Sequence, residues 1–274
     1  MLYVFLISTT VFVLLLGLER MHPLRSAQHN PWERLKVNAL ITALAFAVNG
    51  LVVQPAAQGT IAWSGHRDFG LLHWVNLSPL GQAIVGFLLL DLSFYYWHRL
   101  NHRLLVLWRF HNVHHIDPDL DVSTGFRFHF GEILFSAGFR VLQVSLIGVS
   151  LPVYLIYETV FQANTLFHHS NVQLPRPLER WLNWLLVTPR MHGIHHSQVQ
   201  AETNSNYSVV FSFWDRLHRT LRFNVDAANP AIGVPAYSQG ADNRVLALIK
   251  LPFQSQRDYW GEESSSDRLE PALD

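Results

Sequence analysis

Long apolar runs dominate the chain, and short polar segments separate them. The first run, MLYVFLISTTVFVLLLGLE, has no basic segment before it and no Ala-x-Ala cleavage site, so we expect a retained membrane helix and not a cleaved signal peptide. Four more runs are near the lower end of the length that spans a bilayer as a helix, roughly 17–25 residues. They are Val37–Val53, Leu80–Trp97, Glu132–Val149 and Leu151–Phe167. Buried helices of a large soluble core are the alternative, but five such runs in 274 residues favour a membrane protein.

The basic residues between these runs predict how the chain crosses the membrane. Arg20, Arg25, Arg34 and Lys36 lie between the first two runs, and Arg67 is the single Lys or Arg between residues 54 and 79. Short cytoplasmic loops carry the excess of Lys and Arg. We therefore expect residues 20–36 in the cytoplasm, residues 54–79 outside and the N-terminus outside.

The segment GVSLP at residues 148–152 predicts a turn between the last two apolar runs. Gly148 is suited to end one helix, Ser150 to cap the next, and Pro152 to occupy its first turn. A helical hairpin there leaves the cytoplasm and returns to it. Every histidine-rich segment is then expected on the cytoplasmic side.

The amino-acid composition limits the partners and the metal ligands that the chain can have. The chain is 49% hydrophobic and 15% charged, with a formal net charge of zero, whereas soluble domains carry about 25% charged residues. No excess of positive charge points to nucleic acid. Cysteine is absent, which excludes disulfides, thiolate metal sites and iron–sulfur clusters in this chain and leaves imidazole and carboxylate as metal ligands.

Three short motifs, called histidine words below, contain eight of the sixteen histidines: HRLNH at 98–102, HNVHH at 111–115 and HGIHH at 192–196. On a helix, residues three and four apart share a face, so each word would aim its imidazoles in one direction. So many nitrogen ligands exceed the needs of one ion and predict two metal ions. The zinc-protease motif His-Glu-x-x-His does not occur. The candidate ligands are His98, His102, His111, His114, His115, His192, His195 and His196.

The order of these words resembles the fatty acid hydroxylase superfamily, the membrane di-iron enzymes that include sterol desaturases. The resemblance runs from about Asp91 to Asp215. It rests on DLSFYYWHRLNH (91–102), LWRFHNVHH (107–115), TGFRFHFGE (124–132), FHHSN (167–171), HGIHH (192–196) and NYSVVFSFWDRL (206–217). It implies a membrane helix bundle that carries a di-iron centre, with the eight histidines as ligands.

The resemblance also implies one more ligand from the run that ends at FHHSN. His168 and His169 both qualify, and Asn164, one turn earlier, could supply a weak or water-mediated ligand. His129 falls in the family's Arg-x-His-Pro-x-Glu word, although Phe130 stands here in place of the proline.

Two carboxylates in apolar runs are candidates for a catalytic or supporting role. Asp91 lies two helical turns before His98, where it could accept an imidazole N–H and orient the ring. Glu158 lies eleven residues before His169 and is costly in a membrane unless it is paired or functional. A helix–helix hydrogen bond is the equal alternative for both, and Glu132 is expected to pair with Arg127 or a neighbour. The isolated His22, His29, His66 and His73 are assigned no metal.

We therefore predict an all-α integral membrane bundle of about four to five spans, capped by a cytoplasmic histidine-rich helical region. Residues 1–79 would form N-terminal membrane helices, 80–222 the di-iron domain and 223–274 a cytoplasmic tail that ends in a disordered polar segment. The amphipathic segment RPLERWLNWLL (176–186) is expected at the membrane interface, with Trp181 and Trp184 at interfacial depth.

The predicted activity is O2-dependent hydroxylation or desaturation of an unactivated C–H bond in a lipid such as a sterol or fatty acyl chain. Two iron ions would be the cofactor, and zinc can replace them in purified protein. Electrons would come from a separate electron-transfer protein and an NAD(P)H-dependent reductase, and a bacterial inner membrane is the expected location. The alternatives are a zinc-dependent membrane hydrolase and a metal-binding or metal-transport protein, although a transporter should hold its ligands near the membrane midplane.

Overall fold

The computed structural model describes residues 2–224 and 229–261. In these residues the chain is helical, with no strand beyond three isolated β-bridges. The predicted all-α fold is therefore confirmed. The helices are α1 (Leu2–Met21), α2 (Pro31–Val48), α3 (Gln54–His66), α4 (Leu71–Trp74), α5 (Pro79–Arg103), α6 (Leu105–His115), α7 (Phe130–Ile147), α8 (Leu151–His169), α9 (Arg176–Leu182), α10 (Pro189–His195), α11 (Gln200–Thr203), α12 (Phe213–Leu217) and α13 (Val245–Lys250). Four shorter turns complete them: the π-helix η1 (Asn49–Val53) and the 3-10 turns η2 (Val122–Phe126), η3 (Pro235–Tyr237) and η4 (Leu251–Phe253).

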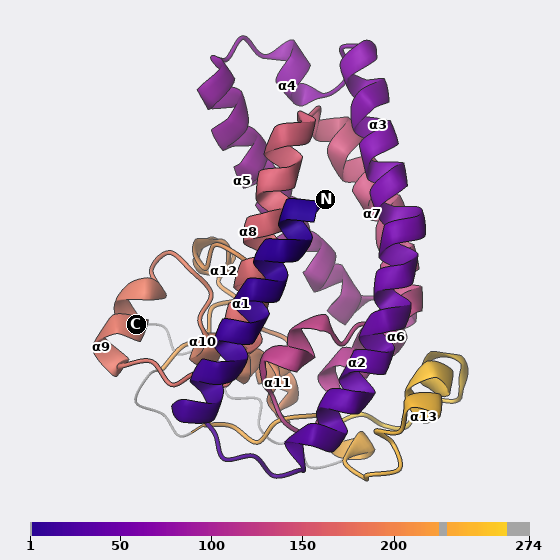
Figure 1. Ribbon diagram of the computed structural model, residues 1–274, viewed down its shortest axis with the longest axis vertical. Helices are drawn as coiled ribbons and strands as arrows, with labels where there is room; N and C mark the ends of the chain where they lie inside the picture. Colours follow the sequence, from indigo (N-terminus) through magenta and orange to yellow (C-terminus); the bar gives the residue numbers. More distant parts are fainter. Residues whose placement is uncertain (1, 225–228, 262–274) are drawn as a thin grey trace.

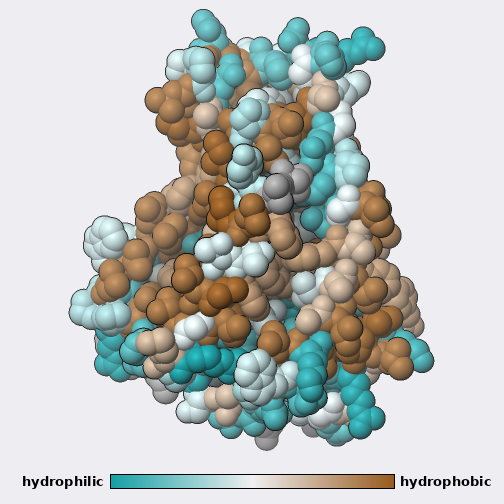
Figure 2. Space-filling model, viewed as in Figure 1, coloured by the Kyte–Doolittle hydropathy of each residue, from teal (hydrophilic) through white to brown (hydrophobic). Residues whose placement is uncertain are grey.

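Long helices form a rod, and the short elements gather into a cap at one end of it (Figure 1). Four helical stretches are long and apolar enough to cross a membrane: Tyr3–Met21, Pro31–Trp74, Pro79–Arg103 and Phe130–Ile147. α8 lies among them and packs against α1 and α5. Figure 2 shows apolar side chains over the middle of the molecule and polar ones at its two ends, as expected for a protein that faces lipid.

The second apolar run is longer than its sequence predicts. It was expected to end at Val53 before an external loop of residues 54–79, but the helix continues through η1 and α3 to His66. Pro55 is tolerated because it stands in the first turn after the π-helix, where its missing N–H and its ring meet a widened turn. α2, η1 and α3 therefore carry the chain to the end of the rod that lies opposite the cap (Figure 1).

The hairpin between α7 and α8 forms where the sequence predicts it. Gly148 ends α7 in the left-handed conformation, with φ of 73°, and Ser150 and Pro152 begin α8. Gly70 approaches this turn so closely that a Cβ on Gly70 would lie 2.5 Å from the Gly148 Cα. Two glycines thus let the α3–α4 connection pack on the tip of the hairpin.

A buried ion network fixes the loop after α6 to α2. The Arg34 guanidinium donates to Asp117 and Asp121, with N···O distances of 2.8 and 2.6 Å, and Asn38 donates to Asp117 at 3.0 Å. Burial alone would raise the pKa of Asp117, but Arg34 and Arg127 outweigh it and hold that pKa at about 2. The loop that leaves the α6 histidines is therefore rigidly placed.

Candidate metal centre

Four helices bring ten histidines together at the junction of rod and cap. α5 contributes two from its last turns, α6 three, α8 two from its last turn and α10 with its C-cap three. Nine of the rings are buried, and His102 is half-buried. These are the ten candidates that the sequence predicts: His98, His102, His111, His114, His115, His168, His169, His192, His195 and His196.

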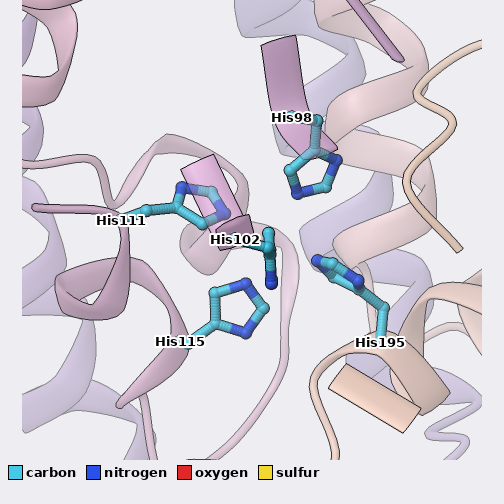
Figure 3. A group of neighbouring side chains, drawn as sticks. All are labelled: His98, His102, His111, His115 and His195. Carbon is cyan, nitrogen blue, oxygen red and sulfur yellow. The ribbon is translucent and has the colours of Figure 1, made fainter. Parts of the chain in front are cut away.

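Nine of these side chains fall into two groups, each with its potential ligand atoms within 4.8 Å of one another. The first group, drawn in Figure 3, is His98, His102, His111, His115 and His195. The second group is His114, His169, His192 and His196. The groups adjoin, because the His115 and His196 rings stack at a centroid distance of 4.3 Å. Both His-x-x-His-His words are thus divided between the two groups.

Hydrogen bonds from behind orient three rings of the first group. His98 Nδ1 lies 2.8 Å from the Tyr207 carbonyl oxygen, and His195 Nδ1 lies 2.6 Å from that of Ser205. His111 Nδ1 lies 2.8 Å from a carboxylate oxygen of Glu132. Each contact places the ring proton on Nδ1, which leaves Nε2 with a free lone pair. In Figure 3 these rings turn toward one another.

The second group converges on one point. His169 donates its Nδ1 proton to the Thr165 carbonyl at 2.7 Å, and its Nε2 lies 3.0 Å from His114 Nε2 and 2.9 Å from His192 Nε2. Three ring nitrogens that approach one another so closely form a natural position for a shared cation.

The unpaired nitrogens test whether metal ions fit this centre. A buried polar atom without a partner costs about 1–3 kcal/mol, so a native fold keeps few of them. Here they gather in one place, and metal ions bound by imidazole nitrogen would satisfy them together. Buried ring nitrogens without a hydrogen bond are Nε2 of His111, His115 and His195, Nδ1 of His114 and His192, and both nitrogens of His102 and His196. The donor set therefore fits two nitrogen-bound metal ions.

Burial keeps the His195 and His196 imidazoles neutral by lowering their pKa. It lowers the pKa of His195 to about 3 and, together with neighbouring His114, moves the pKa of His196 well below its ordinary value. The protonated form would lose its hydration in this packed cluster. Neutral imidazole is the form that binds metal, so the cap holds these rings ready as ligands.

Glu132 has a different partner from the one that the sequence predicts. Arg127 instead donates to the Val113 carbonyl, Asn38 and Asn243, while Glu132 accepts the His111 proton. The prediction paired Glu132 with the nearest cation in the sequence, but the helix start directs its carboxylate toward α6. The signal available in the sequence was an acid in the first turn of an apolar helix.

Asp91 does not contact an imidazole in the way that the sequence predicts. Its carboxylate accepts hydrogen bonds from the Val210 and Phe211 backbone N–H groups and from the Trp214 ring at 2.8 Å. Residues 210–214 therefore supply the donors that were expected from an imidazole. Through these hydrogen bonds Asp91 holds residues 210–214 against α5 and so joins distant parts of the chain.

Glu158 forms the helix–helix contact that was its alternative role. It lies 2.7 Å from the Arg140 guanidinium on α7 and 3.2 Å from the Gln54 amide on α3. Arg140 is also surrounded by aromatic rings, with Phe94 the nearest at 5.0 Å. The ion pair lies inside the rod and away from both histidine groups.

The remaining candidates lie beside the two groups. His168 lies against His192 at a centroid distance of 4.1 Å, with the two rings tilted by 51°, but is in neither group, whereas His169 belongs to the second. The Asn164 amide donates to the Val209 carbonyl and lies 3.4 Å from His168 Nδ1, so the amide faces the loop that contains Val209. His129 caps α7 by accepting the Gly131 N–H at 2.9 Å.

The four histidines without an assigned role lie outside both groups, which the sequence also predicts. His29 contacts Asp119 at 3.3 Å, and His73 lies 3.8 Å from Asp68 at the far end of the rod. Neither contact involves a second histidine.

A cavity of about 150 Å³ lies against the histidines and extends into the rod. Its lining includes His98, His111 and His169 at one end and Arg140 and Glu158 at the other. Glu158 is eleven residues from His169 on α8, which corresponds to about 16 Å along a helix. Polar side chains and a set of aromatic and aliphatic side chains share the wall, and the latter are Phe46, Val53, Phe94, Trp97, Phe126, Phe128, Ile133 and Phe161. An elongated, mostly apolar ligand fits this shape.

Comparison with known proteins supports this chemistry. An ornithine lipid hydroxylase of Rhizobium tropici is 33% identical over 206 residues, which are 74% of this chain and 58% of that protein. The alkylglycerol monooxygenase of Homo sapiens is 30% identical, over 58% of this chain and 34% of that protein. The cholesterol 25-hydroxylase of Homo sapiens is 29% identical, over 56% of this chain and 60% of that protein.

The chain therefore spans about a third to three fifths of the length of these relatives. No solved structure matches it. The fatty acid hydroxylase family model matches residues 83–220, which contain every histidine of both groups. That match covers half of the 274 residues, and the chain belongs to the fatty acid hydroxylase family.

Proposed function

We propose that the protein is a membrane-bound di-iron oxygenase that hydroxylates an unactivated C–H bond of a lipid. The observation that carries this proposal is the pair of buried histidine groups at the end of an apolar cavity inside a membrane helix bundle. The names of the relatives agree, because they describe hydroxylases and monooxygenases of ornithine lipid, alkylglycerol and cholesterol.

The proposed reaction consumes one lipid C–H bond, O2, two electrons and two protons. One oxygen atom enters the C–H bond to give an alcohol, and the other leaves as water. Two iron ions, when bound, would activate O2, which the imidazole and carboxylate side chains cannot do by themselves. Removal of two hydrogens instead would give an alkene, so desaturation is the second outcome of the same chemistry.

Nine histidines are the proposed ligands, five for one ion and four for the other. Glu132 would orient His111 and make its ring a stronger donor, which is the usual role of a carboxylate behind a metal-bound imidazole. His168 would support His192 from beside the centre, and zinc can replace iron in purified protein. Asp91 is proposed to hold the 206–217 segment against α5, and it is given no catalytic role.

The cavity would place the substrate. Its aromatic wall excludes water from the reacting C–H bond, and it positions an apolar chain against the histidines. Arg140 and Glu158 at its far end would bind a polar group of the lipid. The distance of about 16 Å between that pair and His169 would then select which carbon reaches the centre.

The rival functions have less support. A transporter would hold its ligands near the middle of the membrane, whereas these histidines lie at helix ends and in the cap. A zinc hydrolase of the His-Glu-x-x-His type is not encoded, since that motif does not occur in the chain. We propose a bacterial inner membrane as the location, with the cap in the cytoplasm, where a reductase and a carrier can reach it.

Lipids extracted from a bacterial host that expresses the protein, grown under 18O2, test the function. We expect a lipid with one added 18O atom, absent with His196→Ala and retained with His66→Ala. Loss of two hydrogens without added oxygen would identify desaturation. Label that enters from water, or products without O2, would overturn the oxygenase proposal in favour of hydrolysis.

A further inference from the structure

Trp108 connects the first histidine group with the surface of the cap. Its ring centroid lies 4.9 Å from that of His102 and 5.3 Å from that of His115. On its other side the Trp260 ring stacks at 6.4 Å, with an angle of 29° between the planes. Trp108 is 6% exposed, whereas Trp260 is half-buried. The two indoles therefore form a packed aromatic bridge from the histidines to solvent.

Such a bridge has a use in the proposed reaction, which needs two electrons from outside the chain. Electron tunnelling weakens steeply with distance, and a continuous aromatic contact carries it better than a gap does. His102 has both ring nitrogens without a hydrogen bond, so it is a ligand candidate in direct contact with Trp108. A route from Trp260 through Trp108 thus ends at the proposed centre.

The surface around Trp260 is basic. Tyr259 and Trp260 pack on the same apolar cluster as Val245 and Ile249 of α13, so α6, α13 and the 251–261 segment form one surface. Its acidic residues are Asp242, which pairs with Arg257, and Asp258. The described cations on it outnumber these acids and are Arg109, Arg244, Lys250 and Arg257, all exposed. Exposed Phe253 adds an apolar contact beside them.

From these observations we infer that an acidic one-electron carrier protein docks on this surface and delivers electrons through Trp260 and Trp108. Opposite charges steer two proteins together and set the orientation of their complex. Each docking oxidises one carrier by one electron and reduces the centre by one electron, with no bond made or broken. Two dockings supply one O2. The inference rests on the proposed function, because it names the partner of that centre.

Binding tests the surface separately from lipid oxidation. An acidic plant-type [2Fe–2S] ferredoxin is the probe, titrated at low salt against the full chain in detergent, with and without iron. For Arg109→Glu combined with Lys250→Glu we expect a dissociation constant about tenfold higher. The effect should fade at high salt. Arg222→Glu is the control, because Arg222 is exposed and lies outside α6, α13 and the 251–261 segment. Equal losses in both variants, or none in either, would overturn the docking surface.

The rate of iron reduction tests the aromatic bridge. Iron-loaded protein is mixed with saturating reduced ferredoxin without O2 or lipid, and the absorbance of the centre is followed. Trp260→Leu should slow this first-order reduction by about tenfold or more while iron content stays unchanged, and Trp260→Phe should restore part of the rate. Because the ferredoxin is saturating, a weaker complex does not by itself lower this rate. An unchanged rate in Trp260→Leu would overturn the route. Normal reduction with no lipid oxidation in the wild type would instead overturn the proposed function alone.

Discussion

The His111 imidazole is held from behind by Glu132, a residue 21 positions later in the chain. Glu132→Gln keeps the size of this side chain but removes its charge, so the ring loses its strongest orienting partner. We expect metal affinity to fall about 10–100-fold, the usual loss for such supporting residues. Metal analysis of detergent-purified protein measures it, with Glu33→Gln as the exposed control, because Glu33 pairs only with Lys36 on the surface. Full metal retention in Glu132→Gln would show that the bond does not support binding.

Clustered and isolated histidines should behave differently. His102→Ala and His196→Ala each remove a ring whose two nitrogens are buried and unpaired, so we expect less bound metal and no lipid oxidation. His66→Ala and His73→Ala change rings at the far end of the rod and should leave both properties near wild type. Metal content and product are measured in the same preparations. Equal metal in all four variants would mean that the histidine groups bind none.

Helix spacing predicted that each His-x-x-His-His word aims its rings in one direction, but the structure divides both words between the two groups. His114 and His115 are adjacent in sequence and point into different groups, because they leave α6 about 100° apart. Asp91 shows the same limit. Its place two turns before His98 was read correctly, yet the partner that opposes it comes from residues 210–214, more than a hundred positions away.

At the scale of elements, Asp91 fixes the segment before α12 to α5. Its nearly inaccessible carboxylate accepts three hydrogen bonds, of which the one from the Trp214 ring is the shortest. Trp214→Phe removes that donor together with part of the ring. We expect it to lower the free energy of unfolding by about 1.5–3 kcal/mol, the range for a bond to a charged group.

A double-mutant cycle in detergent checks this contact. Asp91→Asn and Trp214→Phe together should cost less than the sum of the single changes, because the first weakens the bond that the second removes. Trp181→Phe is the control, since Trp181 is 70% exposed on α9. Additive effects would deny the contact. Lost activity at wild-type stability in Asp91→Asn would return Asp91 to a catalytic role.

Element prediction succeeded where the sequence carries a local stop signal and failed where the signal was ambiguous. Gly148, Ser150 and Pro152 mark a turn in their own segment, and the turn forms there. The second run was expected to end at Val53, but Asn49 and Gly50 lie in the π-helix, Pro55 follows in the first turn of α3, and the helix continues. A proline after a widened turn is compatible with a helix, which no single-residue preference reveals.

For the whole molecule, the apolar pattern predicted a membrane bundle, and the candidate spans agree with it. The sequence could also predict that all histidine words meet at one end, since an even number of crossings separates them. The division at residues 79 and 222 stays a prediction, and the predicted disordered tail at 262–274 lies outside the described residues. The shape of the cavity could not be predicted, because its wall combines side chains from α2, α5, α7 and α8.

Orientation in the membrane gives the last prediction. The chain has no cysteine, so single introduced cysteines report their side of the membrane without background. The charge of the first loop predicts that Glu33→Cys and Gly240→Cys face the cytoplasm and that Asp68→Cys faces outward. All three positions are exposed and make few contacts.

An impermeant maleimide added to intact cells should label Asp68→Cys alone, and all three should react after the cells are opened. The structure sharpens the choice of sites: Asp68 lies in the turn before α4 at the far end of the rod, whereas Glu33 and Gly240 belong to the end that holds the cap (Figure 1). A label on Gly240→Cys in intact cells would put the histidine groups on the outer side. There no cytoplasmic carrier could reduce them, and both the proposed electron donor and the oriented bundle would have to be abandoned.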